Sequence, residues 1–167
     1  MTNNKDVLGN ALWEYHQSPG HQELITWTSL TEEEPLPLSY FFRTYNRMPP
    51  LEQKALELTH GKVLDVGCGA GCHSLYLQNN RKISVLGLDN SLAAIKVAAG
   101  RGLLKTSSQS IFDFYGYTFD TILLLMNGPG ICGSLKRLKL LLEKLKSLLN
   151  PGGQILLDSS DLIYLFD

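Results

Sequence analysis

The residues best suited to binding chemistry form the pattern acid-x-Gly-x-Gly-x-Gly between Asp65 and Gly71. A dinucleotide-binding loop has the spacing G-x-G-x-x-G, which packs a pyrophosphate against a helix N-terminus. Counted from Gly67, the third glycine of that spacing would fall on Cys72. A carboxylate at this place repels a pyrophosphate and attracts an ammonium group. The pattern therefore favours a nucleoside ligand that carries an amino group and no phosphate. The loop residues expected to bind it are Gly67, Cys68, Gly69 and Gly71.

A second acid, Asp89, stands 22 residues after Gly67, at the end of another apolar run. In nucleotide-binding α/β folds an acid at this place accepts hydrogen bonds from the hydroxyls of a ribose. We therefore expect Asp89, with its neighbour Asn90, to belong to the same site as Asp65. A helix-capping or surface role for Asp89 is the alternative.

The elements that must position these residues alternate between strand and helix patterns. A short apolar run over 62–66 is typical of a strand buried on both faces, and a helix pattern over 72–79 follows it. Further strands are expected over 83–88, 103–108, 119–126 and 154–158. Further helices are expected after Ser91 and from Ser134 to 149, each capped by its serine. The strand over 103–108 is polar enough for a sheet edge.

This alternation predicts an α/β fold with a parallel sheet and right-handed crossovers. Ligands bind such sheets at the carboxyl ends of the strands. Four polar side chains fall at expected strand ends: Asp65, Asp89, Asn127 and Asp158.

From Lys62 to Asp158 the chain resembles the class I S-adenosylmethionine-dependent methyltransferases, and Asp65–Gly71 matches their motif I. The resemblance implies a three-layer Rossmann-like sheet, with S-adenosylmethionine as cofactor and S-adenosylhomocysteine as product. It also implies that Asp89 is the acid of motif II. Ser110 and Ile111 occupy the adenine-contacting position, where members of the family commonly carry an acid and an apolar residue. Ser110 departs from that pattern, and Asp113 is the candidate substitute.

The segment after the fourth expected strand, Met126-Asn-Gly-Pro-Gly130, is where the resemblance places the reactive methyl group. It distantly resembles the Asn-Pro-Pro-aromatic motif of amino-methylating enzymes, but Gly128 and Gly130 replace the first proline and the aromatic residue. The carbonyl of Asn127 could orient an acceptor, and a purely structural turn is an equal alternative. Methyl transfer from a sulfonium is an in-line displacement that depends mainly on alignment. A general base is needed only where the acceptor must lose a proton. The expected acceptor is a small molecule of unspecified identity.

Residues 1–60 are expected to form an N-terminal helical cap or lid, and residues 61–167 the cofactor-binding core. A helix over 5–17 has an apolar side formed by Val7, Leu8, Ala11, Leu12 and Tyr15. Residues 23–29 fit either a strand or a helix turn, and 32–37 are expected to be a solvated turn. A helix beginning at Pro49-Pro50 has an expected buried stripe of Leu51, Ala55 and Leu58.

Four aromatic residues and two arginines gather in the segment Tyr40–Arg47. As a lid, this segment would pair Arg43 with the carboxylate of the cofactor, because a guanidinium matches a carboxylate in bidentate fashion. Its aromatic residues, Tyr45 among them, would cover the sulfonium through cation–π contact. The alternative is that these aromatic residues form the core of an N-terminal layer.

Bulk composition excludes several classes of protein. The chain has 167 residues, 44% hydrophobic content and a net charge of −1. It is therefore expected to be a soluble cytoplasmic protein with no general bias toward nucleic acid or membrane. Its three cysteines have no disulfide or zinc spacing, so no metal site is expected. The rival functions are a non-catalytic S-adenosylmethionine-binding or assembly domain, a nicotinamide-dependent oxidoreductase and a nucleic-acid methyltransferase.

The family's sheet normally ends in a hairpin of two strands, and only residues 159–167 follow the last expected strand. The sequence thus predicts a truncated fold that lacks the last two strands. An open strand edge recruits another chain. We therefore expect the edge over 154–158 to form a homodimer, or to be covered by Leu162–Phe166. Catalysis is expected to be weak, because part of the acceptor pocket would be missing.

Overall fold

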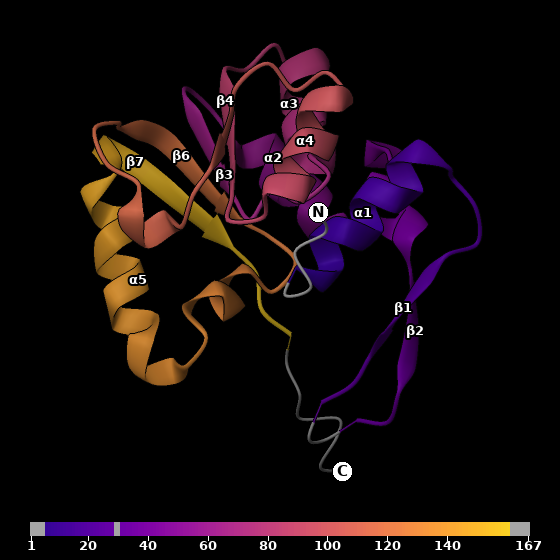
Figure 1. Ribbon diagram of the computed structural model, residues 1–167. Coiled ribbons are helices and arrows are strands. Elements are labelled where there is room, and N and C mark those ends of the chain that lie inside the picture. The colour runs from indigo at the N-terminus through magenta and orange to yellow at the C-terminus, as the bar shows by residue number, and fades with distance from the viewer. Residues whose placement is uncertain (1–5, 29–30, 161–167) are drawn as a thin grey trace.

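The computed structural model describes residues 6–28 and 31–160, and its centre is a five-stranded parallel sheet in the order β5-β4-β3-β6-β7 (Figure 1). Every pair of neighbouring strands in it is parallel. The strands are β3 (Val63–Val66), β4 (Val85–Asp89), β5 (Thr106–Ser108), β6 (Phe119–Leu124) and β7 (Leu149–Leu157). The predicted α/β class and the edge position of the polar strand are both confirmed.

Helices cover both faces of this sheet and make three layers. α5 (Leu135–Ser147) lies on one face, and α2 (Pro50–Leu58), α3 (Cys72–Asn79) and α4 (Leu92–Gly100) lie on the other (Figure 1). On the α5 side, Leu141 and Leu145 pack with sheet residues such as Ile122. On the opposite side, Leu56 of α2 and Leu77 of α3 share a buried cluster with the strands. The strand order reverses between β3 and β6, and such a switch point is where α/β sheets bind ligands.

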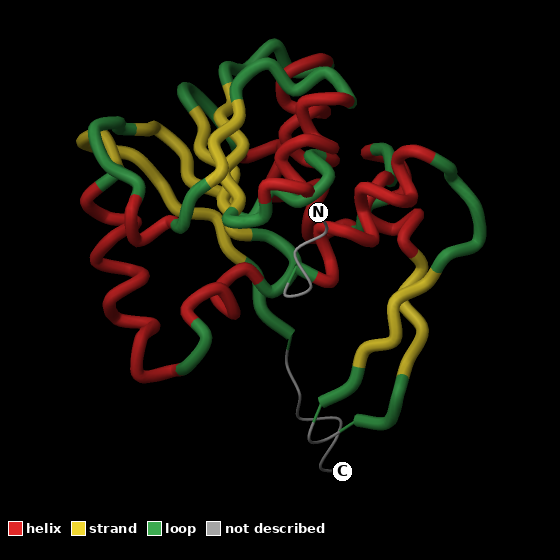
Figure 2. The backbone as a smooth tube through the Cα atoms, viewed as in Figure 1, coloured by secondary structure: helices red, strands yellow, loops and turns green. Residues whose placement is uncertain are grey.

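The N-terminal segment contains a β-hairpin as well as helices. α1 (Val7–Gln17) lies against α4, and the antiparallel strands β1 (Glu23–Thr26) and β2 (Glu34–Pro37) extend away from the body of the molecule (Figure 2). The 3₁₀ helices η1 (Leu38–Phe42) and η2 (Tyr45–Arg47) then lead to α2. The solvated turn predicted over 32–37 was therefore wrong. Two prolines are tolerated in β2 because it is an edge strand.

Four helices bury a different face from the one that their apolar residues predicted. In α2, Leu51 and Leu58 are exposed, whereas Glu52 and Leu56 are buried. The reason is that Glu52 finds two charged partners in the interior. Several other leucines and alanines predicted to face inward are exposed: Leu8 in α1, Leu92 and Ala99 in α4, and Leu135 and Leu142 in α5. Ser91 caps α4 as expected, but the side chain of Ser134 makes no capping bond.

The last strand begins at Leu149, so residues 150–153, which were expected only to end a helix, lie in β7. The side chain of Asn150 anchors the start of β7 by donating a hydrogen bond to Asp120 Oδ1 at 2.8 Å. β7 pairs with β6 on one side and with no other strand among residues 6–28 and 31–160. The predicted cover, residues 162–166, lies outside the described residues. No helix in the described ranges is long and apolar enough to cross a membrane.

Candidate active site

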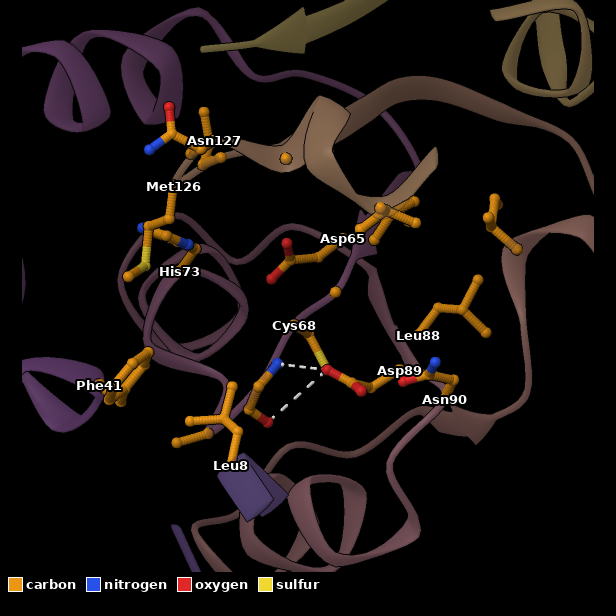
Figure 3. Close-up of a pocket in the computed structure, with 18 of the residues that line it drawn as sticks. Leu8, Phe41, Asp65, Cys68, His73, Leu88, Asp89, Asn90, Met126 and Asn127 are labelled. Atoms are coloured by element: carbon orange, nitrogen blue, oxygen red, sulfur yellow. Dashed lines mark hydrogen bonds between the residues drawn. The ribbon is translucent and has the colours of Figure 1, made fainter. Parts of the chain in front are cut away.

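A cavity of about 370 Å³ opens at the carboxyl ends of the central strands (Figure 3). It lies at the switch point between β3 and β6, at the strand ends where the sequence predicted a ligand site. The predicted site residues that line it are Asp65, Gly67, Cys68, Gly69, Asp89, Asn90, Ser110, Ile111 and Asn127. Three predicted site residues, Arg43, Tyr45 and Gly71, are outside this lining.

The loop after β3 depends on glycine for its backbone conformation. Gly67, Gly69 and Gly71 have φ angles of +73°, +52° and +81°, which side-chain-bearing residues rarely adopt. A Cβ added to Gly69 would meet no atom within 4 Å, so open space lies beside the loop. Gly71 serves packing instead, because its added Cβ would stand 3.2 Å from Ala98 Cβ of α4. The loop can therefore bring backbone N–H groups close to a ligand.

Asp65 places a buried carboxylate at the floor of the cavity. Its exposed fraction is 2%, and Oδ2 accepts a 2.6 Å hydrogen bond from Ser74 Oγ. Burial raises the pKa of Asp65, and His73 and Ser74 act in the opposite direction. A buried carboxylate is costly without a cation, so this site is suited to an ammonium group.

Asp89 joins the second strand to the glycine loop. Its Oδ2 accepts from Gly69 N at 2.9 Å (Figure 3). Its Oδ1 accepts from Ser91 N, also at 2.9 Å. Burial raises the pKa of Asp89 against the lowering effect of these two N–H groups. The carboxylate thus holds the loop in place and still borders the cavity.

The wall expected to contact adenine is formed by Ser110 and Ile111, and the sequence reasoning missed their neighbours Gln109 and Phe112 in the same wall. Ser110 Oγ accepts from Phe112 N at 3.2 Å and so begins the 3₁₀ helix η3 (Ile111–Asp113). Asp113 is exposed and outside the lining, so the structure does not support it as the substitute acid.

Asn127 borders the cavity in a constrained turn. Met126 and Asn127 have φ angles of +63° and +59°, and their N–H groups donate to the carboxylate of Asp158 at 3.1 and 2.7 Å. Asn127 Oδ1 also accepts from the N–H of Ser160 at 2.7 Å and from its hydroxyl at 3.0 Å. The carbonyl predicted to orient an acceptor therefore already has two donors within the chain. Strained backbone of this kind persists where surrounding contacts over-determine it.

The two residues predicted as the lid's ligand contacts face elsewhere. Arg43 is 6% exposed, pairs with Glu52 and donates to Tyr40 O at 2.5 Å. Tyr45 stacks on Tyr76 with ring centroids 4.2 Å apart. The N-terminal segment reaches the cavity through other side chains, those of Leu8 and Phe41.

His73 lines the cavity and was absent from the sequence prediction. It is 5% exposed, and its Nε2 lies 2.6 Å from Glu52 Oε2. Burial alone would lower the pKa of His73, but Cys72, Glu52 and Asp65 outweigh burial and raise it to about 10. Burial acts to raise the pKa of Glu52, but hydrogen bonds from His73 and Arg43 leave it below its usual value. The signal in the sequence that could have identified His73 is its position, because this histidine stands in the first turn of the helix that follows the glycine loop.

The donor set suits an amino-acid nucleoside. It combines a buried acid, a second acid on the loop, an apolar wall and open space beside Gly69. Within the described ranges, no group of three or more His, Cys, Asp or Glu side chains could hold a metal ion. Cys68, Cys72 and Cys132 are free and buried.

Comparison with known proteins decides the family. A profile described as a methyltransferase domain matches residues 58–165. The chain belongs to the class I S-adenosylmethionine-dependent methyltransferases. A crystal structure of an S-adenosylmethionine-dependent methyltransferase from Bacteroides fragilis, in complex with S-adenosylhomocysteine, superposes with a TM-score of 0.90 at 40% identity. That match covers 99% of this chain and 69% of the other.

Two further methyltransferases are more distant. Phosphoethanolamine N-methyltransferase from Triticum aestivum is 32% identical over 117 residues, 61% of this chain and 21% of its own length. The chain therefore spans about a fifth of that curated relative. The sugar N-methyltransferase from a Streptoalloteichus species has a TM-score of 0.62 at 19% identity over 84% of this chain and 60% of its own, and it supports the fold alone. Membership of this family does not favour the nicotinamide-dependent alternative.

Proposed function

We propose that this methyltransferase chain binds S-adenosylmethionine in the cavity beside the glycine loop and transfers its methyl group to a small-molecule acceptor. The observation that carries the proposal is the pairing of two acids, Asp65 and Asp89, on either side of that loop at the switch point. An amino-acid nucleoside presents an ammonium group and a ribose diol at two separate places, and each acid suits one of them.

The cofactor, when bound, supplies an activated methyl group on a sulfonium. Asp65 would then bind the ammonium group, Asp89 would accept from the ribose hydroxyls, and Ile111 would lie against the adenine. The task left to the protein is alignment and exclusion of water, which can supply most of the rate of an in-line displacement. Leu8 and Phe41 line the cavity and would exclude water from it.

Amines are the first acceptors to test. This choice is supported by the wheat relative, which is a phosphoethanolamine N-methyltransferase and is matched over 21% of its length. The loop after β6 borders the cavity through Met126 and Asn127, and an acceptor would approach there. An acceptor bound as an ammonium must lose a proton before it attacks, so a primary amine should react faster as the pH approaches its own pKa.

The decisive experiment combines binding with turnover. S-adenosylhomocysteine at about 100 times its Kd should stabilise the fold by roughly 2.7 kcal/mol, measured as a shift in Tm. Methyl-labelled S-adenosylmethionine is then offered with amine, hydroxyl and thiol acceptors, with Asp65→Asn as the binding-deficient control. Label transfer by the wild type alone supports the proposal. Binding without transfer to any class would instead favour a cofactor-binding domain, and stabilisation by NAD alone would refute the site.

A further inference from the structure

The cavity has an unbalanced set of charges. Its lining contains the carboxylates of Asp65 and Asp89 and, within the described ranges, no lysine or arginine. The amino-acid end of S-adenosylmethionine has a carboxylate as well as an ammonium group. A carboxylate removed from water is costly unless a cation or strong donors meet it. Arg43 was predicted to provide that cation, but it is outside the lining and is paired with Glu52.

His73 is the side chain in the lining that can supply a positive charge. It stands in the first turn of α3, directly after the glycine loop, and is buried. Its Nε2 is 2.6 Å from Glu52 Oε2, so this carboxylate holds the ring and favours its charged form. Both ring nitrogens of a charged imidazole are donors. Because Nε2 is engaged by Glu52, a ligand would meet Nδ1, and the neighbouring Cys72 also interacts with this side chain.

His73 and its neighbour Asp65 have opposite charges that complement the two charges of an amino-acid zwitterion. Figure 3 shows His73 and Asp65 projecting into the same part of the cavity, while Asp89 borders another part. Asp65 and His73 are close enough for each to influence the charge of the other. A carboxylate and an imidazolium placed in this way meet an ammonium and a carboxylate on one α-carbon.

We infer that His73 binds the carboxylate of the cofactor's amino-acid moiety, with Glu52 as the residue that positions it. The inference rests on the proposed function and deepens it. Arg43 then has an indirect part, because it shares Glu52 Oε2 with His73 and keeps that buried carboxylate compensated.

The test compares ligands that differ in the carboxylate alone. Kd is measured by calorimetry for S-adenosylmethionine and for its decarboxylated form, which keeps the sulfonium and one ammonium group. His73→Gln should weaken binding of S-adenosylmethionine by roughly ten- to hundredfold and leave binding of the decarboxylated form unchanged. His60→Gln is the matched control, because His60 is exposed and outside the cavity. Its Kd for both ligands should equal that of the wild type.

An equal loss of affinity for both ligands would show that His73 has a merely structural role. No loss of affinity for either ligand would show that His73 does not bind the carboxylate. Each of these results would overturn the inference. A second measurement needs no variant: the imidazole NMR signals of His73 in the wild type should shift with S-adenosylhomocysteine far more than with methylthioadenosine. Equal shifts would contradict it. Failure of the wild type to bind S-adenosylmethionine at all would refute the proposed function instead.

Discussion

Four side chains of alternating charge meet beneath the cavity: Arg43, Glu52, His73 and Asp65. All are at least 94% buried, so none of them has bulk water to solvate its charge. Removing one partner of a buried pair is strongly destabilising, because the other charge stays buried and unpaired. These charges therefore also fix the geometry of the site, because each one is stable only when its oppositely charged neighbour is in place.

The pH dependence of stability should report the charge of His73. Its pKa is about 10 in the folded protein and 6.5 for an ordinary histidine, so the folded state holds this proton more tightly. The resulting stabilisation is fully present below pH 6.5 and is lost as the pH rises through about 10. Urea unfolding across this range should show a decline that is shallower in His73→Gln. Parallel profiles for the two proteins would show that His73 is neutral in the fold.

Asp89→Ala should weaken cofactor binding more than it weakens the fold. The variant would lose the proposed bonds to the ribose, and hydrogen bonds to a charged group contribute about 1.5–3 kcal/mol, or roughly ten- to hundredfold in Kd. It also frees the N–H of Gly69. Calorimetry with S-adenosylhomocysteine measures the change, and exposed Asp113→Ala is the control. An unchanged Kd in folded Asp89→Ala would remove this residue from the site.

At the scale of elements, α1 is joined to α4, beside the cavity, through shared helix caps. Asp6 accepts from Gly9 N at 3.0 Å at the start of α1. The hydroxyl of Ser91, which caps α4, donates to the same carboxylate at 2.6 Å. This contact places Leu8 of α1 at the cavity and sets α1 beside the turn that follows Asp89.

Gly9→Ala should displace α1 from α4. An added Cβ at Gly9 would stand 2.1 Å from Ser91 Oγ and 2.4 Å from Asp6 Oδ2, which is too close for either to remain in place. Overpacking of this kind costs about 1–3 kcal/mol, against roughly 0.5–1 kcal/mol gained from a better helix former. Hydrogen exchange in the first turn of α4 should rise and the Kd for S-adenosylhomocysteine should increase. Gly20→Ala, at an exposed position near only the Gln22 side chain, should change neither.

The elements that sequence predicted best were those defined by local chemistry. Apolar runs located β3 and β6, and the glycine spacing located the loop, because both depend on neighbouring residues alone. The buried face of α2 could not be predicted, since burial of Glu52 depends on Arg43 and on His73, which is 21 residues away. The β1–β2 hairpin was missed because its second strand, Glu-Pro-Leu-Pro, has the composition of a turn.

In the candidate site, too, the features set by local sequence were predictable and those set by tertiary contacts were not. The acids and the loop follow from spacing, and so does their convergence at strand ends. The partners of Arg43 and Tyr45 are tertiary, and no local pattern reveals that a guanidinium is already paired. Asn127 was located correctly at the cavity, but the use of its carbonyl by Ser160 depends on two segments more than 30 residues apart.

The whole molecule has an unequal pair of sheet edges. β5 ends one side with only three polar residues, whereas β7 ends the other with nine residues that include Ile155, Leu156 and Leu157. Long apolar edges favour pairing with another chain. The outer side of β7 pairs with no strand in the described part of the chain.

We predict that the chain self-associates through β7. Sedimentation should show a dimer whose fraction rises with concentration, and Leu157→Lys should weaken it, because charged residues on an edge oppose pairing. Leu157 is 44% exposed, so the change should affect folding little. The control is Leu104→Lys, 82% exposed and beside the opposite edge. A monomer at every concentration, or equal effects of both substitutions, would contradict this prediction.

The Arg43–Glu52–His73 arrangement has a consequence for how these three positions evolve. The three positions belong to one buried arrangement, although the first two lie in the N-terminal segment and the third lies in the core. A substitution at one position leaves an uncompensated charge that only a change at another can relieve. Among relatives, these positions should therefore change together or not at all. An N-terminal segment transplanted from a relative should be accepted only when it carries residues that fit the recipient's position 73.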